Sequence, residues 1–293
     1  MKIIGTIKKA GDLLDLKKKC HGVLLRHKDM SLRYDVAFST SELKEVISIA
    51  IKLKFTVYVD FTNLFDDNSL EKAYELVLEL QEHNIFYVYS DLGFFMKLKD
   101  LGLNKKLIYA PDTYVCNYLD FNFFNKYKIY GTFPSLEIPL ADIEVIGKNK
   151  KNKLFYKAFG KTSMFHSKRK LVTLYQENFD LPKISKKSKL KLVEETRKEE
   201  YLIDEKNNGT HIYQTGIRNI LPAIDTINEV VDFLLLDGIY INQEDYLKAI
   251  DIYRNALSDL DRLNYYNNEL KEIFDNLNYK FIFEDTIYKK GDF

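Results

Sequence analysis

The chain has 293 residues, of which 46% are hydrophobic and 30% charged, and this composition is typical of a globular protein with a sizeable core. Its two cysteines, Cys20 and Cys116, are too few for a disulfide framework, a structural zinc site or an iron–sulfur cluster. No apolar run is long enough to cross a bilayer and no signal-peptide core begins the chain, so we expect a cytoplasmic protein with no membrane partner.

Short runs rich in β-branched and aromatic residues alternate along the chain with helical patterns. The predicted strands are 2–7, 22–27, 56–61, 85–90, 106–111, 128–133, 153–159 and 232–238, and the clearest helices are 41–53, 68–83, 91–101 and 139–146. Eight strands that alternate with helices predict an α/β fold of the TIM-like (β/α)8 barrel class. A doubly wound sheet is the alternative, but no Gly-x-Gly-x-x-Gly motif follows the first strand.

One long insertion separates the seventh and eighth predicted strands. We expect residues 1–258 to form a single barrel that includes this basic insertion, at about 160–230. Inside it, residues 201–213 predict a hairpin that turns at Asn208 and Gly209. Residues 259–293 predict a helical extension packed on the barrel, with a β-like end at 281–288.

Positive charge is concentrated around this insertion, although the net charge of the whole chain is only +1. Residues 145–198 contain sixteen Lys or Arg and four Asp or Glu. Cations bind phosphates and aromatic rings stack on unpaired bases, so the segment 159–175 predicts an RNA- or anion-binding surface. The candidates are Arg26, Arg33, Lys161, Lys168, Arg169, Lys170, Tyr175 and Arg197. A solvated, lysine-rich segment without a partner is the alternative.

Catalytic candidates are the polar residues that end the predicted strands. Asp60, Asp91 and Asp112 end three strands and could share one mouth of the barrel, for acid–base work or a metal ion. Helix caps and turns are the alternative roles of Asp91 and Asp112. His166 lies near two serines, but no Gly-x-Ser-x-Gly motif supports a serine nucleophile. We therefore retain Asp60, Asp112 and His166 as candidates and predict no metal site.

A colinear series of segments resembles the collagenase-like peptidases of family U32. The similar segments are 22–47, 55–80, 89–103, 131–146, 159–175 and 231–257. The resemblance implies a TIM-like barrel, in agreement with the strand count, and it implies a link to RNA hydroxylation.

The chain departs from this family at the residues that hold an iron–sulfur cluster. Cysteine-bearing members have four cysteines where this chain has Ser163, Lys170, Leu192 and Thr196. The pattern retains Gly160, Ser167, Arg169, Tyr175 and Arg197. Since such a cluster needs four thiolates, the resemblance implies no cluster in this chain and a cluster in its partner only.

The resemblance is to the short, cysteine-poor branch of the family. It implies a subunit that works with a longer, cysteine-bearing paralogue and tRNA in the prephenate-dependent 5-hydroxylation of the wobble uridine, with prephenate as a ligand. A collagenase-like peptidase is the first alternative. The second is a barrel that binds a small anionic metabolite through Arg26, Arg33, Lys161 and Arg169.

Overall fold

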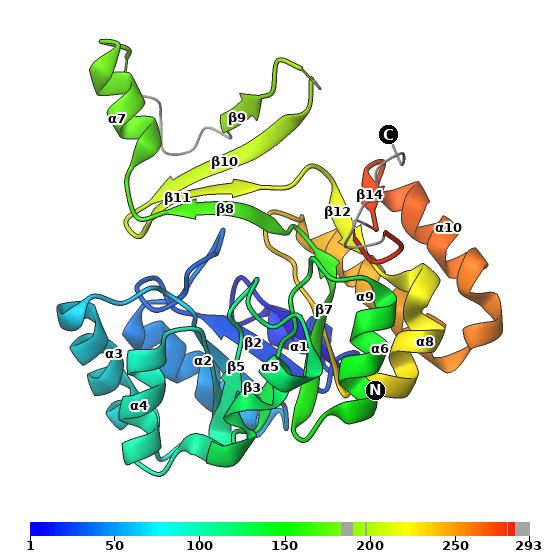
Figure 1. Ribbon diagram of the computed structural model, residues 1–293, viewed down its shortest axis with the longest axis horizontal. Helices are drawn as coiled ribbons and strands as arrows, with labels where there is room; N and C mark the ends of the chain where they lie inside the picture. Colours follow the sequence, from blue (N-terminus) through cyan, green and yellow to red (C-terminus); the bar gives the residue numbers. More distant parts are fainter. Residues whose placement is uncertain (183–189, 197, 280, 285–293) are drawn as a thin grey trace.

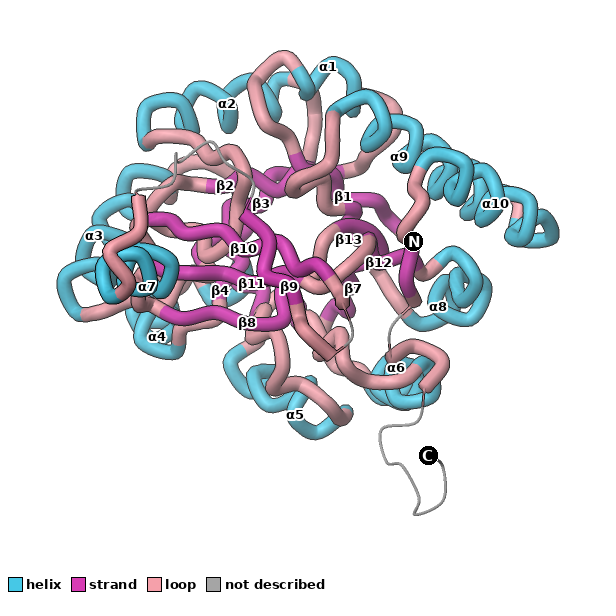
Figure 2. Tube along the Cα trace, turned by 90° about the horizontal axis from the view of Figure 1, so that it is seen from above, coloured by secondary structure: helices cyan, strands magenta, loops and turns pink. Residues whose placement is uncertain are grey.

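Eight parallel strands close into a barrel, which confirms the predicted fold class (Figures 1 and 2). The structure, a computed structural model, describes residues 1–182, 190–196, 198–279 and 281–284. The barrel strands are β1 (Lys2–Thr6), β2 (Gly22–Arg26), β3 (Thr56–Phe61), β4 (Ile85–Tyr89), β5 (Leu107–Tyr109), β6 (Gly131–Thr132), β7 (Lys153–Gly160) and β13 (Phe233–Leu236). They follow one another around the barrel, and β13 pairs with both β7 and β1.

Alternate residues of each strand point into the barrel, because successive side chains of a strand face opposite sides. The interior side chains form a tightly packed apolar cluster of Ile4, Leu24, Tyr58, Val88, Ile108, Phe155, Phe233 and Leu235. The Phe155 and Phe233 rings stack with centroids 4.4 Å apart. The intervening residues of the strands pack outward against the helices and form the larger core.

Helices surround the barrel, and four of them correspond to the helices predicted at 41–53, 68–83, 91–101 and 139–146. The surrounding helices are α1 (Asp12–Leu16), α2 (Thr40–Lys52), α3 (Asp67–Leu80), α4 (Leu92–Asp100), α5 (Tyr118–Asn122), α6 (Leu140–Asn149), α8 (Ile224–Val230) and α9 (Gln243–Ser258). Asp91 caps α4, where its carboxylate accepts a hydrogen bond of 2.8 Å from the backbone N–H of Phe94. Across the described ranges, no helix combines the length and the apolar character needed to cross a membrane.

The insertion forms a second sheet over the C-terminal ends of the barrel strands (Figure 1). Its antiparallel strands have the order β8 (Ser163–Ser167), β11 (Gly209–Tyr213), β10 (Glu200–Lys206) and β9 (Leu190–Val193). Helix α7 (Leu171–Asn178) follows β8. The predicted hairpin is present as β10 and β11, but its turn lies one residue earlier than predicted, because Lys206 pairs with Gly209 and leaves Asn207 and Asn208 as the loop. We call this sheet the roof.

The chain leaves the roof through β12 (Ile217–Asn219), which pairs with β7, and later passes through α9. Helix α10 (Leu263–Ile273) then packs beside α9, and β14 (Leu277–Asn278) pairs with β12. The predicted strand at 281–288 is wrong for residues 281–284, which form a turn, and residues 285–288 lie outside the described residues. The paired strand lies a few residues earlier, where Leu277 can reach Ile217.

Candidate functional site

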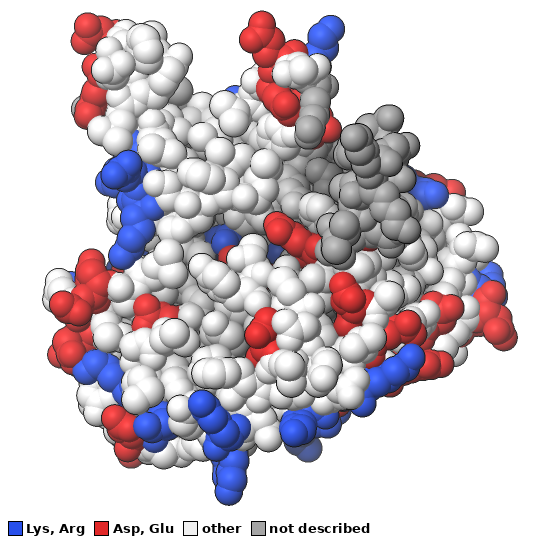
Figure 3. Space-filling model, in the orientation of Figure 1, with Lys and Arg blue, Asp and Glu red and all other residues white. Residues whose placement is uncertain are grey.

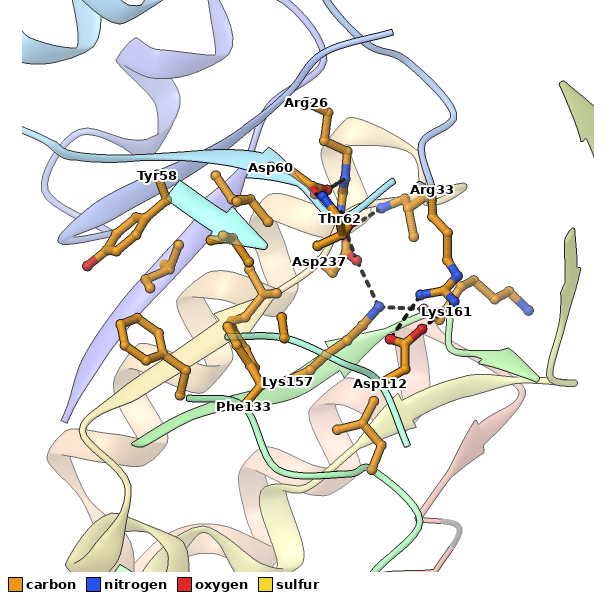
Figure 4. Close-up of a pocket in the computed structure, with 18 of the residues that line it drawn as sticks. Arg26, Arg33, Tyr58, Asp60, Thr62, Asp112, Phe133, Lys157, Lys161 and Asp237 are labelled. Atoms are coloured by element: carbon orange, nitrogen blue, oxygen red, sulfur yellow. Dashed lines mark hydrogen bonds and ion pairs between the residues drawn. The ribbon is translucent and has the colours of Figure 1, made fainter. Parts of the chain in front are cut away.

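A cavity of about 120 Å³ lies inside the barrel mouth, beneath the roof (Figure 4). Its floor is apolar and includes Ile4, Leu24, Tyr58, Val88, Phe133, Phe155 and Leu235. Its upper part is lined by Arg26, Arg33, Asp60, Asp112, Lys157, Lys161 and Asp237. Tyr213 of β11 lines it from the roof, so the cavity belongs to the barrel and the insertion together.

Four charged side chains form one layer directly above the apolar floor. Two-residue periodicity places Arg26, Asp60 and Lys157 one inward step after Leu24, Tyr58 and Phe155. The carboxylate of Asp237 joins two of these strands, since it lies 2.9 Å from Arg26 Nη2 and 2.8 Å from Lys157 Nζ. Asp60 lies on the other side of Arg26, with 3.7 Å between Oδ2 and Nε. The layer therefore pairs cations and carboxylates from four strands.

Burial and ion pairing shift the pKa values of this layer in different directions. Burial raises the pKa of Asp237, but Arg26 and Lys157 outweigh it, and the pKa of this carboxyl lies well below its usual value. Burial lowers the pKa of Lys157, although Asp237 opposes the change. Burial also raises the pKa of Asp60, and Arg26 and the hydrogen bonds from Thr62 offset this only in part. Asp60 is thus the more readily protonated carboxyl of the two.

Two further cations stand at the rim of the cavity. Arg33, in the loop after β2, donates two hydrogen bonds to Asp112, one of them 3.0 Å long. Asp112 has a φ of +65°, a left-handed conformation that aspartate tolerates better than most residues. Lys161, after β7, has no acidic partner in the described ranges, and burial lowers its pKa. Its side chain extends away from Lys157 and Asp237 (Figure 4), so its ammonium group is a rim cation that could pair with an anion bound at the entrance.

The charges of the lining do not balance. Four cations face three carboxylates, and the excess positive charge lies above an apolar, aromatic floor. Such a cavity suits a small anion with an apolar body, since the floor would cover that body and the cations would pair with its charge.

The mouth brings together five of the residues predicted from the sequence: Arg26, Arg33, Asp60, Asp112 and Lys161. His166 is not among the lining residues. It lies on the roof, stacked on His211 with ring centroids 4.6 Å apart, and its Nε2 is 3.3 Å from the carbonyl oxygen of Asn208. Ser163 Oγ donates to the carbonyl oxygen of Phe165 rather than to a histidine. The predicted serine–histidine proximity therefore produces no nucleophile and base pair here.

The remaining predicted cations lie outside the cavity. Lys168, Arg169 and Lys170 are exposed at the start of α7, Tyr175 is exposed on that helix, and Arg197 lies outside the described residues. The cations of residues 145–198 do not lie on one surface, because β7 runs through the whole barrel. Lys150 and Lys153, at its start, pair with Asp232 at the end of the barrel opposite the roof.

The four positions at which the resemblance implies cluster ligands in cysteine-bearing relatives do not converge. Ser163 lies on β8 and Lys170 directly before α7, whereas Leu192 lies on β9 and Thr196 in the turn that follows. Strands β8 and β9 are opposite edges of the roof, about 14 Å apart at three strand spacings. None of these four side chains is a thiolate, and their positions do not lie together, so the residues do not fit an iron–sulfur cluster. Within the described ranges, no three His, Cys, Asp or Glu side chains are grouped as metal ligands.

Lys157 and Tyr213 are among the lining residues that the sequence analysis does not predict. Lys157 lies in a basic stretch and resembled another solvated lysine, although its two-residue spacing from Phe155 indicates an inward side chain. Tyr213 reaches the cavity through the pairing of β11 with β8 and β10, and this long-range register leaves no local pattern.

The barrel and its charged mouth define a TIM-like α/β protein with an inserted roof. A sequence model of Peptidase family U32 matches residues 14–289, and the chain therefore belongs to this family. A relative from Bacillus subtilis (strain 168), "tRNA hydroxylation protein P2", is 26% identical over 235 residues, which cover 77% of this chain and 75% of the relative.

The solved structure of a U32 peptidase agrees with the assignment of the fold. The U32 peptidase Mk0906 aligns with 81% of this chain and 92% of its own, with a TM-score of 0.50 and 10% identity. A thiamine phosphate pyrophosphorylase from Pyrococcus furiosus aligns with 92% of this chain and 95% of its own, with a TM-score of 0.45 and 9% identity.

Proposed function

We propose that this protein is a cluster-free subunit that assists the 5-hydroxylation of the wobble uridine in tRNA. The observation that carries the proposal is the match to tRNA hydroxylation protein P2, which extends over three quarters of both chains. Membership of family U32 over nearly the whole sequence supports it.

A longer, cysteine-bearing paralogue would supply the redox chemistry. Insertion of oxygen into a C–H bond needs a redox centre, and an iron–sulfur cluster of the usual kind needs four thiolates. This chain has two cysteines in all, and none at the four positions where relatives carry ligands. We therefore assign the cluster to the partner, and the handling of tRNA to this subunit.

Removal of the gene tests this function. Nucleosides from the tRNA of a deletion strain would be quantified by mass spectrometry, beside the parent and a complemented strain. We expect 5-hydroxyuridine and its derivatives to disappear on deletion and to return on complementation. Unchanged 5-hydroxyuridine in the deletion strain would disprove the proposal.

The mouth suggests a second function, the binding of a small carboxylate such as prephenate. Lys161 has no acidic partner in the described ranges, and the aromatic floor below it suits a ring-bearing ligand. Titration calorimetry with prephenate should give saturable binding at one site. Absence of heat and of any thermal shift at millimolar prephenate would rule out this ligand.

The peptidase alternative receives less support from the described geometry. Asp112 is paired with Arg33, Asp60 lies beside Arg26, and His166 is on the roof outside the cavity. Incubation of the purified protein with gelatin and peptide libraries tests this alternative. Cleavage that disappears in Asp60→Asn, Asp112→Asn or His166→Gln variants would favour a peptidase over the proposed function.

A further inference from the structure

The end of the barrel opposite the mouth carries a ring of lysines. We define this N-terminal end as the first residue of each barrel strand and up to five residues before it. It contains three acidic residues, Glu82, Glu229 and Asp232. Its fourteen lysines are Lys2, Lys17, Lys18, Lys19, Lys52, Lys54, Lys105, Lys106, Lys126, Lys128, Lys148, Lys150, Lys151 and Lys153. Figure 3 shows Lys and Arg side chains projecting along the lower edge of the barrel.

Most of these lysines have no acidic partner among the residues that the structure describes. Lys19 pairs with Asp251, Lys148 with Glu144, and both Lys150 and Lys153 with Asp232. For the other ten, the described ranges contain no ion pair, and most of the ten are exposed. Unpaired cations at one end of a compact barrel add their potentials and attract a polyanion.

Two hollows lie between the lysines at this end, and one of them reaches a half-buried aromatic pair. The first is lined by Lys2, Lys17, Lys18 and Lys54, and the Tyr58 and Phe233 rings at its base are buried, at 2% and 6% exposed. The second is lined by Lys105, Lys128, Lys150, Lys151 and Lys153, together with Tyr130. Tyr130 and Phe86 are half-buried, with their ring centroids 4.3 Å apart. The N-terminal end therefore offers phosphate-binding cations and one half-buried pair of rings, Tyr130 and Phe86.

Helix dipoles explain only part of this charge. A lysine at the C-terminus of a helix is favourable, and the barrel helices end at this side. Such pairing accounts for about one cation per helix, yet three lysines lie at 17–19 and four at 148–153. Lys18, Lys54 and Lys128 also have a left-handed backbone, with φ of 74°, 66° and 59°, where glycine or asparagine is favoured.

We propose that the N-terminal end of the barrel binds the sugar–phosphate backbone of RNA, with the half-buried Tyr130 and Phe86 rings available to an unpaired base. The inference rests on the proposed function, and it moves the RNA contact from the insertion to the opposite end of the barrel. Lysines and recessed aromatic rings together are typical of binding to unpaired RNA. A flat anionic membrane would not reach the Tyr130 ring, which lies inside a hollow lined by lysines.

The test compares two triple variants of equal charge change. The barrel triple removes three exposed lysines that precede three different strands, through Lys17→Gln, Lys105→Gln and Lys151→Gln. These three lysines have no acidic partner in the described part of the chain. The insertion triple removes three exposed cations from the insertion, through Lys168→Gln, Arg169→Gln and Lys170→Gln. Affinity for bulk tRNA of the native host would be measured by filter binding from about 50 to about 300 mM KCl, with thermal unfolding as the folding control.

We expect the barrel triple to weaken tRNA binding at least tenfold near physiological salt. The slope of log affinity against log salt should become shallower by about 2, as expected for three lost phosphate contacts. The insertion triple should stay within about twofold of the parent.

Three results would overturn the inference. The first is a loss of tRNA affinity in the insertion triple with no loss in the barrel triple, and the second is salt-independent tRNA binding in the parent and both variants. The third is a barrel triple that retains tRNA binding but no longer binds vesicles with about 30 mol% anionic lipid. The deletion strain separates the two proposals. If the deletion strain loses 5-hydroxyuridine but the barrel triple binds tRNA as tightly as the parent, only the inference is refuted. If the deletion strain keeps its 5-hydroxyuridine, the proposed function is refuted.

Discussion

Each end of β13 has one aspartate that pairs with two cations, but the two aspartates differ in burial. Asp237, after the strand, is 3% exposed and lies between Arg26 and Lys157 in the mouth. Asp232, before the strand, pairs with Lys150 and Lys153 at the N-terminal end, where its side chain is 17% exposed. One strand therefore joins a buried, nearly balanced charge layer to a solvated, strongly positive surface.

The same contrast holds around the whole barrel. The last residue of each strand and the five that follow include five basic and six acidic residues, whereas the N-terminal end has fourteen lysines and three acids. Paired and buried charges suit one small ligand, and unpaired exposed charges suit a long polyanion. The two ends of a barrel can thus perform different tasks with the same strands.

The largest expected effect is the loss of the buried aspartate. Asp237→Ala leaves Arg26 and Lys157 without a counter-ion in the barrel, and should lower the free energy of unfolding by about 3–5 kcal/mol. Asp232→Ala at the other end should cost about 1–2 kcal/mol, because water can solvate Lys150 and Lys153. Urea unfolding of both variants checks the difference. Equal costs would mean that the two ends do not differ in burial as described.

Asp237 also makes the free energy of unfolding depend on pH. Its pKa is lower in the folded protein than in the unfolded chain, so its contribution to stability is complete above the unfolded value of about 3.9 and is lost as the pH falls below it. Asp237→Ala should accordingly flatten the decrease of stability under acid conditions.

The next effect concerns the backbone at the exit of β7. Gly160 has a φ of +121°, and a Cβ there would lie 2.2 Å from the carbonyl oxygen of Asp237. Gly160→Ala should lower the free energy of unfolding by about 2–4 kcal/mol, from strain and from displacement of Asp237. Gly102→Ala is the matched control, since Gly102 has a φ of +73° but an added Cβ would meet nothing within 4 Å. Similar costs in both variants would show that the close approach at the mouth is unimportant.

A smaller effect should appear in the roof. Burial, with a further contribution from His166, lowers the pKa of His211 to about 3. The unfolded chain binds a proton near pH 6.5, so stability should decrease below that pH by up to about 1.4 kcal/mol per pH unit until the folded pKa is reached. His211→Gln should reduce this slope in urea unfolding between about pH 7 and pH 5. An unchanged slope would assign the acid sensitivity to other groups.

The smallest expected effect concerns Lys161. Lys161→Gln should weaken the binding of prephenate about tenfold, because it removes the unpaired cation of the mouth. It should leave stability unchanged or raise it by about 0.5 kcal/mol, since a partly buried cation without a partner is lost. Lys151→Gln at the other end should leave prephenate binding unaffected. Calorimetry on both variants measures the contrast, and equal losses would disprove a local role of Lys161.

Local patterns predicted most of the barrel. Each predicted strand overlaps an observed one, and their ends differ by three residues at most, because buried β-rich runs bounded by turns and helices mark strands directly. Asp91 caps a helix, as one of its two predicted roles required. Asp60 and Asp112 meet in the mouth because the carboxyl ends of parallel strands lie at one edge.

Non-local structure explains what the sequence did not predict. The order of the roof strands depends on pairings between segments tens of residues apart, so Tyr213 could not be placed over the cavity. A charge count along the chain grouped Lys150, Lys157 and Lys168 together, although β7 carries them to the N-terminal end, the interior and the roof. A count of lysines before each strand would have indicated the ring, once the strand direction was assigned.

Co-purification from native cells at low salt tests the central claim most directly. We predict that the tagged protein recovers a longer, cysteine-rich member of family U32 together with tRNA, and that the barrel triple variant recovers the paralogue with much less tRNA. Recovery of the protein without the paralogue and without tRNA would contradict the account.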